Sequence, residues 1–405
     1  MDLETLDGLV SSVTVVAAQQ ARAVDLDASF PAEAVEALRK KGLMALIVPE
    51  REGGLGGDLS DYARTAEALG GTCMATALIW TMHCQQVDAI SRHAVGDLRN
   101  EAIESIVKGF YVGSVTTDES TGGSLYSASS AIAPDPTSGQ ILLDRRAPIV
   151  TGGRHADAFL IKVRDSEEAT SRETSLVFAP RADLQITVER DWNMLGMRGV
   201  ENVSMRLSGE LKGTYVVGRR GGFADIATDS FGPLAHIGWS ASWLGCARSA
   251  AQRTTRFLRV RKSSKLKDSS VRESLAQVRM RLEVVSSLLW SCIQEVQRLR
   301  QEGRHLGEPS TQFRLNTLKL VASRECQRAV EELVNIVGLE HGYSQDSPLA
   351  LERALRDMHA ASLLYSNQRL RHSNGALAVL DPDVSVYGFA AANPYGRDKA
   401  GEVPR

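Results

Sequence analysis

The chain lacks the features that would place it at once in a membrane or a secreted compartment. It contains no run approaching the roughly 20 apolar residues that a membrane-spanning helix needs. Its first residues, MDLETLDGLV, are acidic and unlike a signal peptide. The formal net charge is only −2, which gives no electrostatic reason to expect nucleic acid or an anionic membrane as a partner. We therefore expect a cytoplasmic protein.

Cysteine is also scarce, with five scattered residues and neither a CxxC pair nor a metal-type spacing. This pattern is typical of reduced, buried thiols, so we predict no disulfide and no metal site. What the chain does contain is ordinary for a soluble globular protein, with 43% hydrophobic and 24% charged residues. Its 405 residues allow two or three domains with sizeable cores.

The pattern of apolar and turn-forming residues changes twice along the chain. Residues 1–111 show helical patterns, with Pro31 suited to the first turn of one helix. Residues 112–218 consist of short apolar runs between Gly, Asp, Pro and Ser, a pattern typical of antiparallel strands. Residues 219–382 contain long amphipathic helices, and residues 383–405 form a tail of small and polar residues. We predict an α+β fold: an N-terminal α-helical domain, a central antiparallel β domain and a C-terminal helical bundle.

The clearest helix begins near DSSVRES, where Ser270 and Glu273 are spaced to form a capping box. Apolar residues then recur every three or four positions, which predicts a stripe of the width that a bundle helix buries. The stripe consists of Val271, Leu275, Val278, Leu282, Val285, Leu289, Ile293, Val296 and Leu299.

Four further segments are rich in hydroxyl groups or glycine. They are SVTTDESTGGS (114–124), APIVTGGRHADAFLIKVR (147–164), WNMLGMR (192–198) and NIVGLEHGYSQDSPLALERALRD (335–357). Glycines let backbone amides approach a diphosphate, and hydroxyls can bond the edges of a flavin. In this order, and within a helical, β and helical succession, the segments resemble the acyl-CoA dehydrogenase superfamily over about residues 25–382. The resemblance implies the same fold and an FAD cofactor.

The resemblance also implies particular cofactor contacts. Thr117 is similar to the threonine at the flavin ring, and Ser124 corresponds to the serine near the diphosphate. Thr151 fits the threonine of the segment that lines the flavin, where Ile149 stands in place of the usual tryptophan.

The Gly-Tyr loop implies a shared cofactor site. Asn335, Gly338 and Gly342 would approach the FAD of a neighbouring subunit, so we expect a homodimer or a homotetramer. The family's Arg-x-x-Phe-Gly sequence, which reaches the cofactor across the interface, is absent from RVRKSSKLKDSS (259–270). The basic run there is a diphosphate contact or, more simply, a solvated loop.

The usual catalytic glutamate is missing. The family spacing from Arg356 reaches Tyr365, and the alternative position on the first bundle helix reaches Ala235, with His236 beside it. We therefore take Tyr365 and His236 as the candidate bases, because abstraction of the α-proton of a thioester needs a positioned acceptor. Phenol, with its pKa of about 10, is the poorer acceptor. We expect Asp225 and Asp229 to be solvated acids at a helix start.

The remaining histidine of interest is His83, which lies in the apolar stretch WTMHCQQV. We expect it to be a core or pocket-lining residue rather than a catalytic one.

Three functions are compatible with these residues. The first is an FAD-dependent oxidoreductase that acts on the CH–CH group of an acyl thioester, carried on coenzyme A or on a carrier protein, with the electron acceptor left open. The second is a flavin-dependent monooxygenase of the same fold, which needs no α-proton base. The third is a non-catalytic relative that binds an acyl carrier or a partner protein. The surviving threonines and the Gly-Tyr loop favour the first.

Overall fold

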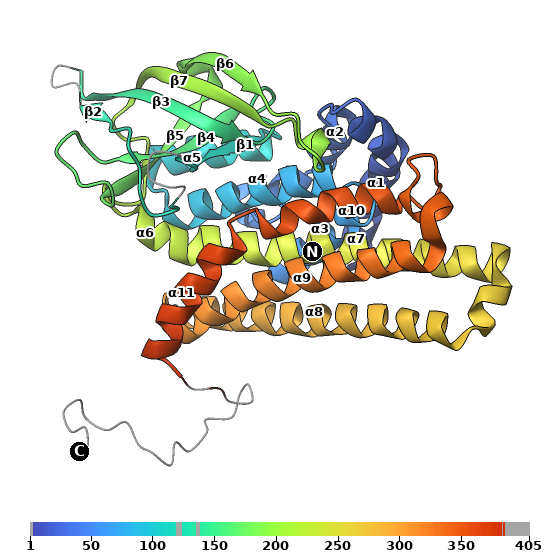
Figure 1. Cartoon of the computed structure of the whole chain (residues 1–405). Helices are drawn as coiled ribbons and strands as arrows, with labels where there is room; N and C mark the ends of the chain where they lie inside the picture. Colours follow the sequence, from blue (N-terminus) through green and yellow to red (C-terminus); the bar gives the residue numbers. More distant parts are fainter. Residues whose placement is uncertain (1–2, 119–123, 135–137, 383, 385–405) are drawn as a thin grey trace, which may run out of the picture.

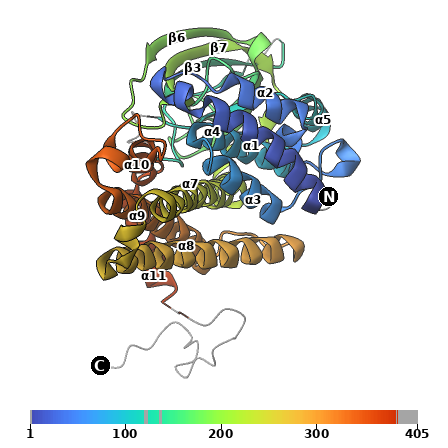
Figure 2. The same ribbon diagram turned by 90° about the vertical axis from the view of Figure 1, so that its right-hand side faces the viewer.

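The computed structural model describes residues 3–118, 124–134, 138–382 and 384 (Figure 1). The turn between Asp118 and Ser124, and nearly all of the tail expected at 383–405, lie outside the described residues. In Figure 1 the layers run from the strands, through α4 and α7, to α9 and α8. Figure 2 shows the same layering end-on, with β3, β6 and β7 on the side opposite α8.

Five α-helices precede the strands in the described residues. Asp58 begins the third of them with a capping box, since its side chain accepts from the backbone of Asp61 while the Asp61 side chain accepts from Asp58 N. The fourth is buried around most of its circumference, as expected from its place between the strands and the bundle. The helices are α1 (Leu3–Leu26), α2 (Ala32–Lys40), α3 (Leu59–Gly70), α4 (Met74–His93) and α5 (Gly96–Val107).

The strands form two four-stranded sheets, with orders β1-β4-β5-β8 and β2-β3-β7-β6. Among the described strands every pair is antiparallel except β1 with β4, whose parallel pairing is permitted by the long stretch of chain between them. The α+β prediction is confirmed, with this one parallel pair added. The strands are β1 (Val112–Val115), β2 (Ala133–Pro134), β3 (Gln140–Val150), β4 (Ala158–Arg164), β5 (Thr174–Pro180), β6 (Gln185–Asp191), β7 (Val203–Lys212) and β8 (Val216–Val217).

Long helices follow. The apolar stripe predicted on α8 faces the core along its whole length, but the predicted capping box is wrong. Asp268 caps the helix by accepting from Ser270 N at 2.9 Å, and so occupies the position assigned to Ser270. The helices are α6 (Phe223–Ile226), a π-helix (Ala227–Phe231), α7 (Gly232–Arg261), α8 (Ser269–Gln301), α9 (Pro309–Gly338), a second π-helix (Leu339–Tyr343), α10 (Leu351–His359) and α11 (Asn367–Leu380).

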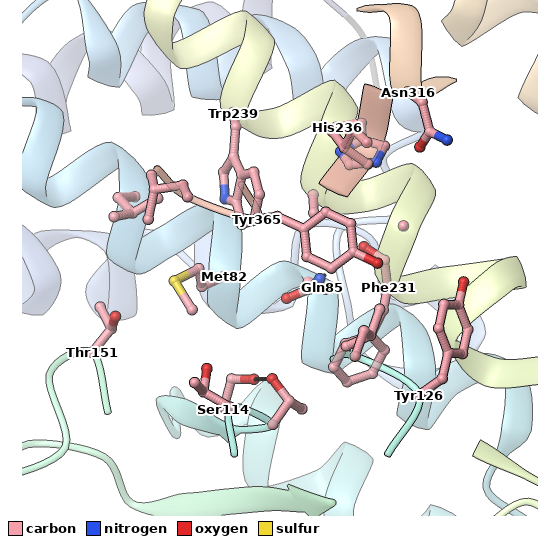
Figure 3. A pocket seen from close by; sticks show the side chains of 18 of the residues that line it. Met82, Gln85, Ser114, Tyr126, Thr151, Phe231, His236, Trp239, Asn316 and Tyr365 are labelled. Carbon is pink, nitrogen blue, oxygen red and sulfur yellow. Dashed lines mark hydrogen bonds between the residues drawn. The ribbon is translucent and has the colours of Figure 1, made fainter. Parts of the chain in front are cut away.

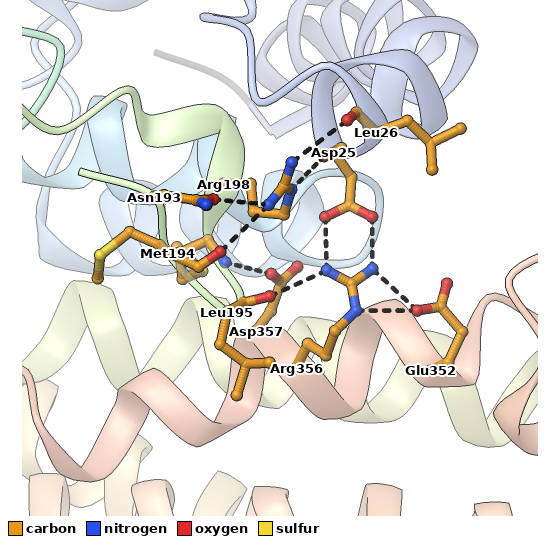
Figure 4. Close-up of polar contacts among 10 residues, drawn as sticks. Asp25, Leu26, Asn193, Met194, Leu195, Arg198, Glu352, Arg356 and Asp357 are labelled. Atoms are coloured by element: carbon orange, nitrogen blue, oxygen red, sulfur yellow. Dashed lines mark hydrogen bonds and ion pairs between the residues drawn. The ribbon is translucent and has the colours of Figure 1, made fainter. Parts of the chain in front are cut away.

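A cluster of polar contacts around Arg356 and Asp357, which we call the joint, connects three parts of the chain (Figure 4). Arg356 of α10 donates to both carboxylate oxygens of Asp25 on α1, at 2.9 and 2.5 Å. The adjacent Asp357 accepts from the backbone N–H of Met197, in the turn that leads to β7. Gly196 is needed in this turn because a Cβ there would lie 2.1 Å from the carbonyl oxygen of Arg356. The joint fixes Met197 against the bundle.

The described helices include none that is both long enough and apolar enough to span a membrane. The five cysteines are free and buried, as the sequence predicted.

Candidate functional site

A cavity of about 500 Å³ lies where the strands meet the helices. We call one side the strand wall; it contains Ser114, Thr116, Thr117 and Thr151. We call the other the helix wall; it contains His236 and Trp239 of α7, Asn316 of α9 and Tyr365, just before α11. Figure 3 shows the labelled members of the two walls on opposite sides of the space between them.

Four of the predicted site residues therefore meet in one cavity, namely Thr117, Thr151, His236 and Tyr365. On the strand wall, the Thr151 hydroxyl donates to Asn202 Oδ1 at 3.0 Å. Such buried bonds fix the rotamer of a side chain that faces a ligand.

Two buried cations hold the segment that contains Thr117. Arg145 donates to the carbonyl oxygen of Thr117 at 2.8 Å and to Asp118 at 3.0 Å. Lys162 donates to the carbonyl oxygens of Ser124 and Leu125, each at 3.0 Å. Burial lowers the pKa of Lys162 to about 8. The two ends of the segment are thus fastened to β3 and β4.

The other predicted cofactor residues lie elsewhere. Ser124 is not among the residues that line the cavity, and its hydroxyl accepts from Tyr126 N at 3.2 Å. Asn335 and Gly338 are at the far end of α9, and Gly342 is in the π-helix Leu339–Tyr343 that follows it. At a rise of 1.5 Å per residue, α9 separates Gly338 from the helix wall by about 33 Å. Within one chain these three residues do not reach the cavity.

The candidate bases are both poor proton acceptors in this environment. Burial lowers the pKa of His236 to about 3, and Lys319 on α9 lowers it too. Burial also raises the pKa of Tyr365, and Tyr126 adds to that rise. The two candidate rings lie close together, with centroids 5.9 Å apart. Tyr365 has a left-handed backbone, φ 47°, which is strained for a bulky residue.

The other titratable residues considered from the sequence have structural roles. His83 is fully buried, accepts from Val112 N at 3.0 Å through Nδ1, and bonds the Met44 carbonyl oxygen at 2.8 Å through Nε2. The prediction that His83 is a core residue is confirmed. For Asp229 the prediction of a solvated acid is wrong, because it is buried and accepts from Arg92 at 3.1 Å.

Asp225, in contrast, is exposed as predicted, although it is paired with Arg219 at 2.9 Å.

Sequence reasoning missed several residues of the cavity. Trp239 lies one turn after His236, so the helical period alone would have placed it on the same face. Asn316 offered no comparable signal, because a polar residue on a long amphipathic helix is usually solvated. Gln85 is held in place by the π-helix Ala227–Phe231, since it donates to the carbonyl oxygen of Phe231 at 2.7 Å.

The lining of the cavity suits the ring of a flavin. Among its described residues there is no Asp, Glu, Lys or Arg. Hydroxyl groups of the strand wall and apolar side chains such as Met197 and Val200 line the same cavity, a combination that can bond the polar edge of a flat ring and pack its faces. In addition, Nδ1 of His236 and Nε1 of Trp239 are buried without a hydrogen-bond partner among the described residues. Buried polar atoms without a partner are rare in folded proteins, so these two favour binding of a ligand that pairs with them.

The fold and this cavity define a class of protein in which two helical parts and a β part enclose a shared ligand site. Two family models match the chain: "Acyl-CoA dehydrogenase, N-terminal domain" at residues 9–109 and "Acyl-CoA dehydrogenase, C-terminal domain" at residues 237–368. The chain belongs to the acyl-CoA dehydrogenase family.

Individual relatives have diverse names. The chain is 22% identical to an acyl-CoA dehydrogenase of Bacillus subtilis (81% of this chain and 84% of that protein). It is 24% identical to the amino sugar nitrososynthase DnmZ of Streptomyces peucetius (85% of each). Among solved structures, butyryl-CoA dehydrogenase from Megasphaera elsdenii matches with a TM-score of 0.81 and 20% identity, over 94% of this chain and 100% of that one. FMN-bound TdsC, a dibenzothiophene monooxygenase from Paenibacillus sp. A11-2, matches with a TM-score of 0.81 and 17% identity. That match covers 95% of this chain and 98% of the other.

Proposed function

We propose that this protein is a flavin-dependent monooxygenase. The observation that carries the proposal is the uncharged cavity, which has no carboxylate among its described lining residues. Its titratable groups are His236, Tyr365 and Tyr126. Burial lowers the pKa of His236 and raises that of Tyr365, which favours the neutral form of each. Tyr126 is 41% exposed, and its raised pKa also keeps the phenol neutral. Abstraction of an α-proton needs an effective base, whereas oxygen transfer from a flavin does not.

Reduced flavin, when bound, would supply the two electrons with which one atom of O₂ goes to the substrate and the other leaves as water. The chain's own residues would hold the ring and exclude water. Thr117 and Thr151 of the strand wall would present hydroxyls to its edge, and the helix wall lies across the cavity from Thr151. Exclusion of water by the bound flavin and the helix wall would limit side reactions. The likeness to a dibenzothiophene monooxygenase supports this reading.

We infer that the cofactor is FAD or a diffusible reduced flavin. If it is FAD, its adenosine half would lie near the Gly338 loop of a neighbouring subunit in a homodimer or homotetramer. The absence of Phe-Gly after α7 favours a weaker hold on the adenosine half.

Dehydrogenation of an acyl thioester, which the sequence ranked first, becomes the second candidate. It is favoured by the likeness to acyl-CoA dehydrogenases and by the meeting of Thr117 and Thr151 with positions 235 and 365 in one cavity. It requires Tyr365 or His236 to accept the α-proton. The change in ranking follows from their pKa values, which the sequence did not reveal.

The test is flavin reactivity. The purified protein is titrated without oxygen with FAD, FMN and their reduced forms, and the flavin-bound protein is mixed with butyryl-, isovaleryl- and octanoyl-CoA. We expect flavin binding, no rapid bleaching by the thioesters, and reoxidation of the bound reduced flavin by O₂ with kinetics unlike those of free flavin. Rapid bleaching would establish dehydrogenation instead. A protein with no flavin affinity would fit the third candidate, a non-catalytic acyl-carrier-binding relative.

A further inference from the structure

The helix wall contains two polar atoms whose hydrogen bonding is left incomplete. Trp239 is 8% exposed and His236 is 4% exposed. The indole Nε1 of Trp239 and Nδ1 of His236 have no partner among the residues that the structure describes. Both residues line the cavity, and both lie on the face of α7 that Figure 3 shows turned toward it. A buried polar atom left unpaired is destabilising, so a ligand that pairs it is favoured.

The surroundings of His236 decide which of its nitrogens carries hydrogen. The side chain of Asn316 next to the ring raises the pKa of His236, which is the direction expected when a ring N–H donates to the amide oxygen. Asn316 can accept through its amide oxygen, while its amide nitrogen donates one hydrogen to Asn374 Oδ1 at 2.9 Å. Since Nδ1 is the unpartnered atom, Nε2 is the donor. In a neutral imidazole Nδ1 then carries a lone pair and is an acceptor.

The ring stays neutral because of its neighbours. Burial opposes an imidazolium here, and the amine of Lys319 opposes it further. Lys319 is itself fully buried and donates to Asn367 Oδ1 at 2.6 Å. No carboxylate lines this side of the cavity among the described residues. His236 therefore offers the cavity an acceptor.

Trp239 offers the complementary group, because an indole N–H only donates. The two rings are one turn apart on α7, with centroids separated by 6.4 Å. An apolar ligand would leave both atoms unpaired, and a ketone or ether could satisfy only Trp239. A cation would be buried without a counter-charge. We propose that the helix wall binds a neutral hydroxyl or amino group of the substrate, which donates to His236 Nδ1 and accepts from Trp239 Nε1.

This inference deepens the proposed function, since it names the polar group of the substrate that the monooxygenase would take. It can nevertheless be tested separately, because the wall can be probed by binding alone, without flavin turnover. The probes are cyclohexanol, cyclohexanone, methylcyclohexane and cyclohexylamine, the last being a cation at neutral pH. They are similar in size and differ in what they donate and accept.

Affinities are measured by calorimetry, and the indole N–H signals are followed by ¹H–¹⁵N NMR, with the signal of Trp239 assigned from the Trp239→Phe variant. We expect cyclohexanol to shift that signal and to bind about tenfold more tightly than each of the other three probes. Trp239→Phe should reduce the preference for cyclohexanol over methylcyclohexane. His236→Phe should abolish the preference for cyclohexanol over cyclohexanone. Trp243→Phe, one turn further along α7 and outside the cavity lining, is the matched control and should change neither.

Three results would overturn the proposal. Cyclohexanol that leaves the Trp239 signal in place would show that the group binds elsewhere. Equal affinity for cyclohexanone would remove the acceptor role of His236, and equal affinity for methylcyclohexane would remove both roles. The probe series on the parent protein decides the matter even if a variant fails to fold. A chain that fails as an oxygenase but shows the preference would retain this inference and lose only the proposed function.

Discussion

The carboxylate of Asp357 accepts a hydrogen bond from the backbone N–H of Met197, 160 residues earlier in the chain. Met197 lines the cavity, so this bond connects the joint on α10 to the site. Asp357→Ala and Asp357→Asn both remove the buried charge, but only alanine also removes the acceptor. We expect the alanine variant to have a free energy of unfolding about 1–3 kcal/mol below that of the asparagine variant, measured by urea denaturation at pH 7. Equal stabilities would show that the bond contributes nothing.

The carboxylate of Asp357 also makes the free energy of unfolding depend on pH, with a sign that can be stated. Burial raises the pKa of Asp357 to about 6, above its unfolded value near 3.8. Between these values the folded state binds more protons, so the contribution of Asp357 to stability falls as pH rises through the window. Relative to the parent, Asp357→Asn should therefore become more stable from pH 4 to pH 6, by an amount on the order of 3 kcal/mol. Denaturation curves at several pH values test this; a difference independent of pH would contradict it.

Replacement of Thr151 tests where the flavin lies. Thr151→Trp would fill the strand wall beside Asn202, so we expect the purified protein to lose its flavin. Thr151→Ser keeps the hydroxyl that donates to Asn202 and should keep the cofactor. Flavin content is read from the absorbance spectrum. Unchanged content in Thr151→Trp, with the fold intact, would refute the placement.

Glutamate can be installed where the family keeps its base. Ala235→Glu and Tyr365→Glu should each raise the rate at which acyl-CoA bleaches the flavin, since general-base catalysis typically contributes about 10²- to 10⁴-fold. The parent should be slow. Ala235→Gln and Tyr365→Gln are the matched controls, because they have nearly the same shape and no base. Fast bleaching by the parent that survives replacement of both Tyr365 and His236 would show that the base lies elsewhere.

Substitutions at the far end of α9 test whether the protein forms the expected homodimer or homotetramer. Leu339 and Tyr343 are 78% and 63% exposed beside the Gly338 loop, where the family resemblance puts a neighbouring subunit. Replacing both by Glu should lower flavin retention and shift light scattering toward smaller species. Val95→Glu, an equally exposed site on the helical N-terminal part, should do neither. A parent that is monomeric at micromolar concentration would contradict the expected homodimer or homotetramer.

Features that depend on local patterns could be predicted from the sequence. The stripe on α8 follows from the 3.6-residue period, and Thr117 and Thr151 follow from short segments that resemble known ones. The cap of α8 was misassigned because Asp268 and Ser270 are both good N-caps, and sequence alone does not set the first turn.

Features that depend on distant partners could not be predicted. Asp229 is buried because Arg92, 137 residues earlier, neutralises it. The parallel pairing of β1 with β4 likewise joins strands that are remote in sequence. The neutrality of His236 required knowledge that Lys319 and Asn316 approach it from α9.

The π-helix Ala227–Phe231 leads directly into α7, one face of which forms part of the helix wall. A π-helical turn holds one residue more than an α-helical turn, so it takes up an extra residue while the helix that follows keeps its facing. Deleting one residue there would return the segment to an α-helix and leave His236 and Trp239 turned toward the strand wall. The loss would fall on Gln85, because its bond to the carbonyl oxygen of Phe231 depends on the wide turn. The turn is thus a place where this family could gain or lose one codon without reorienting the residues of the cavity.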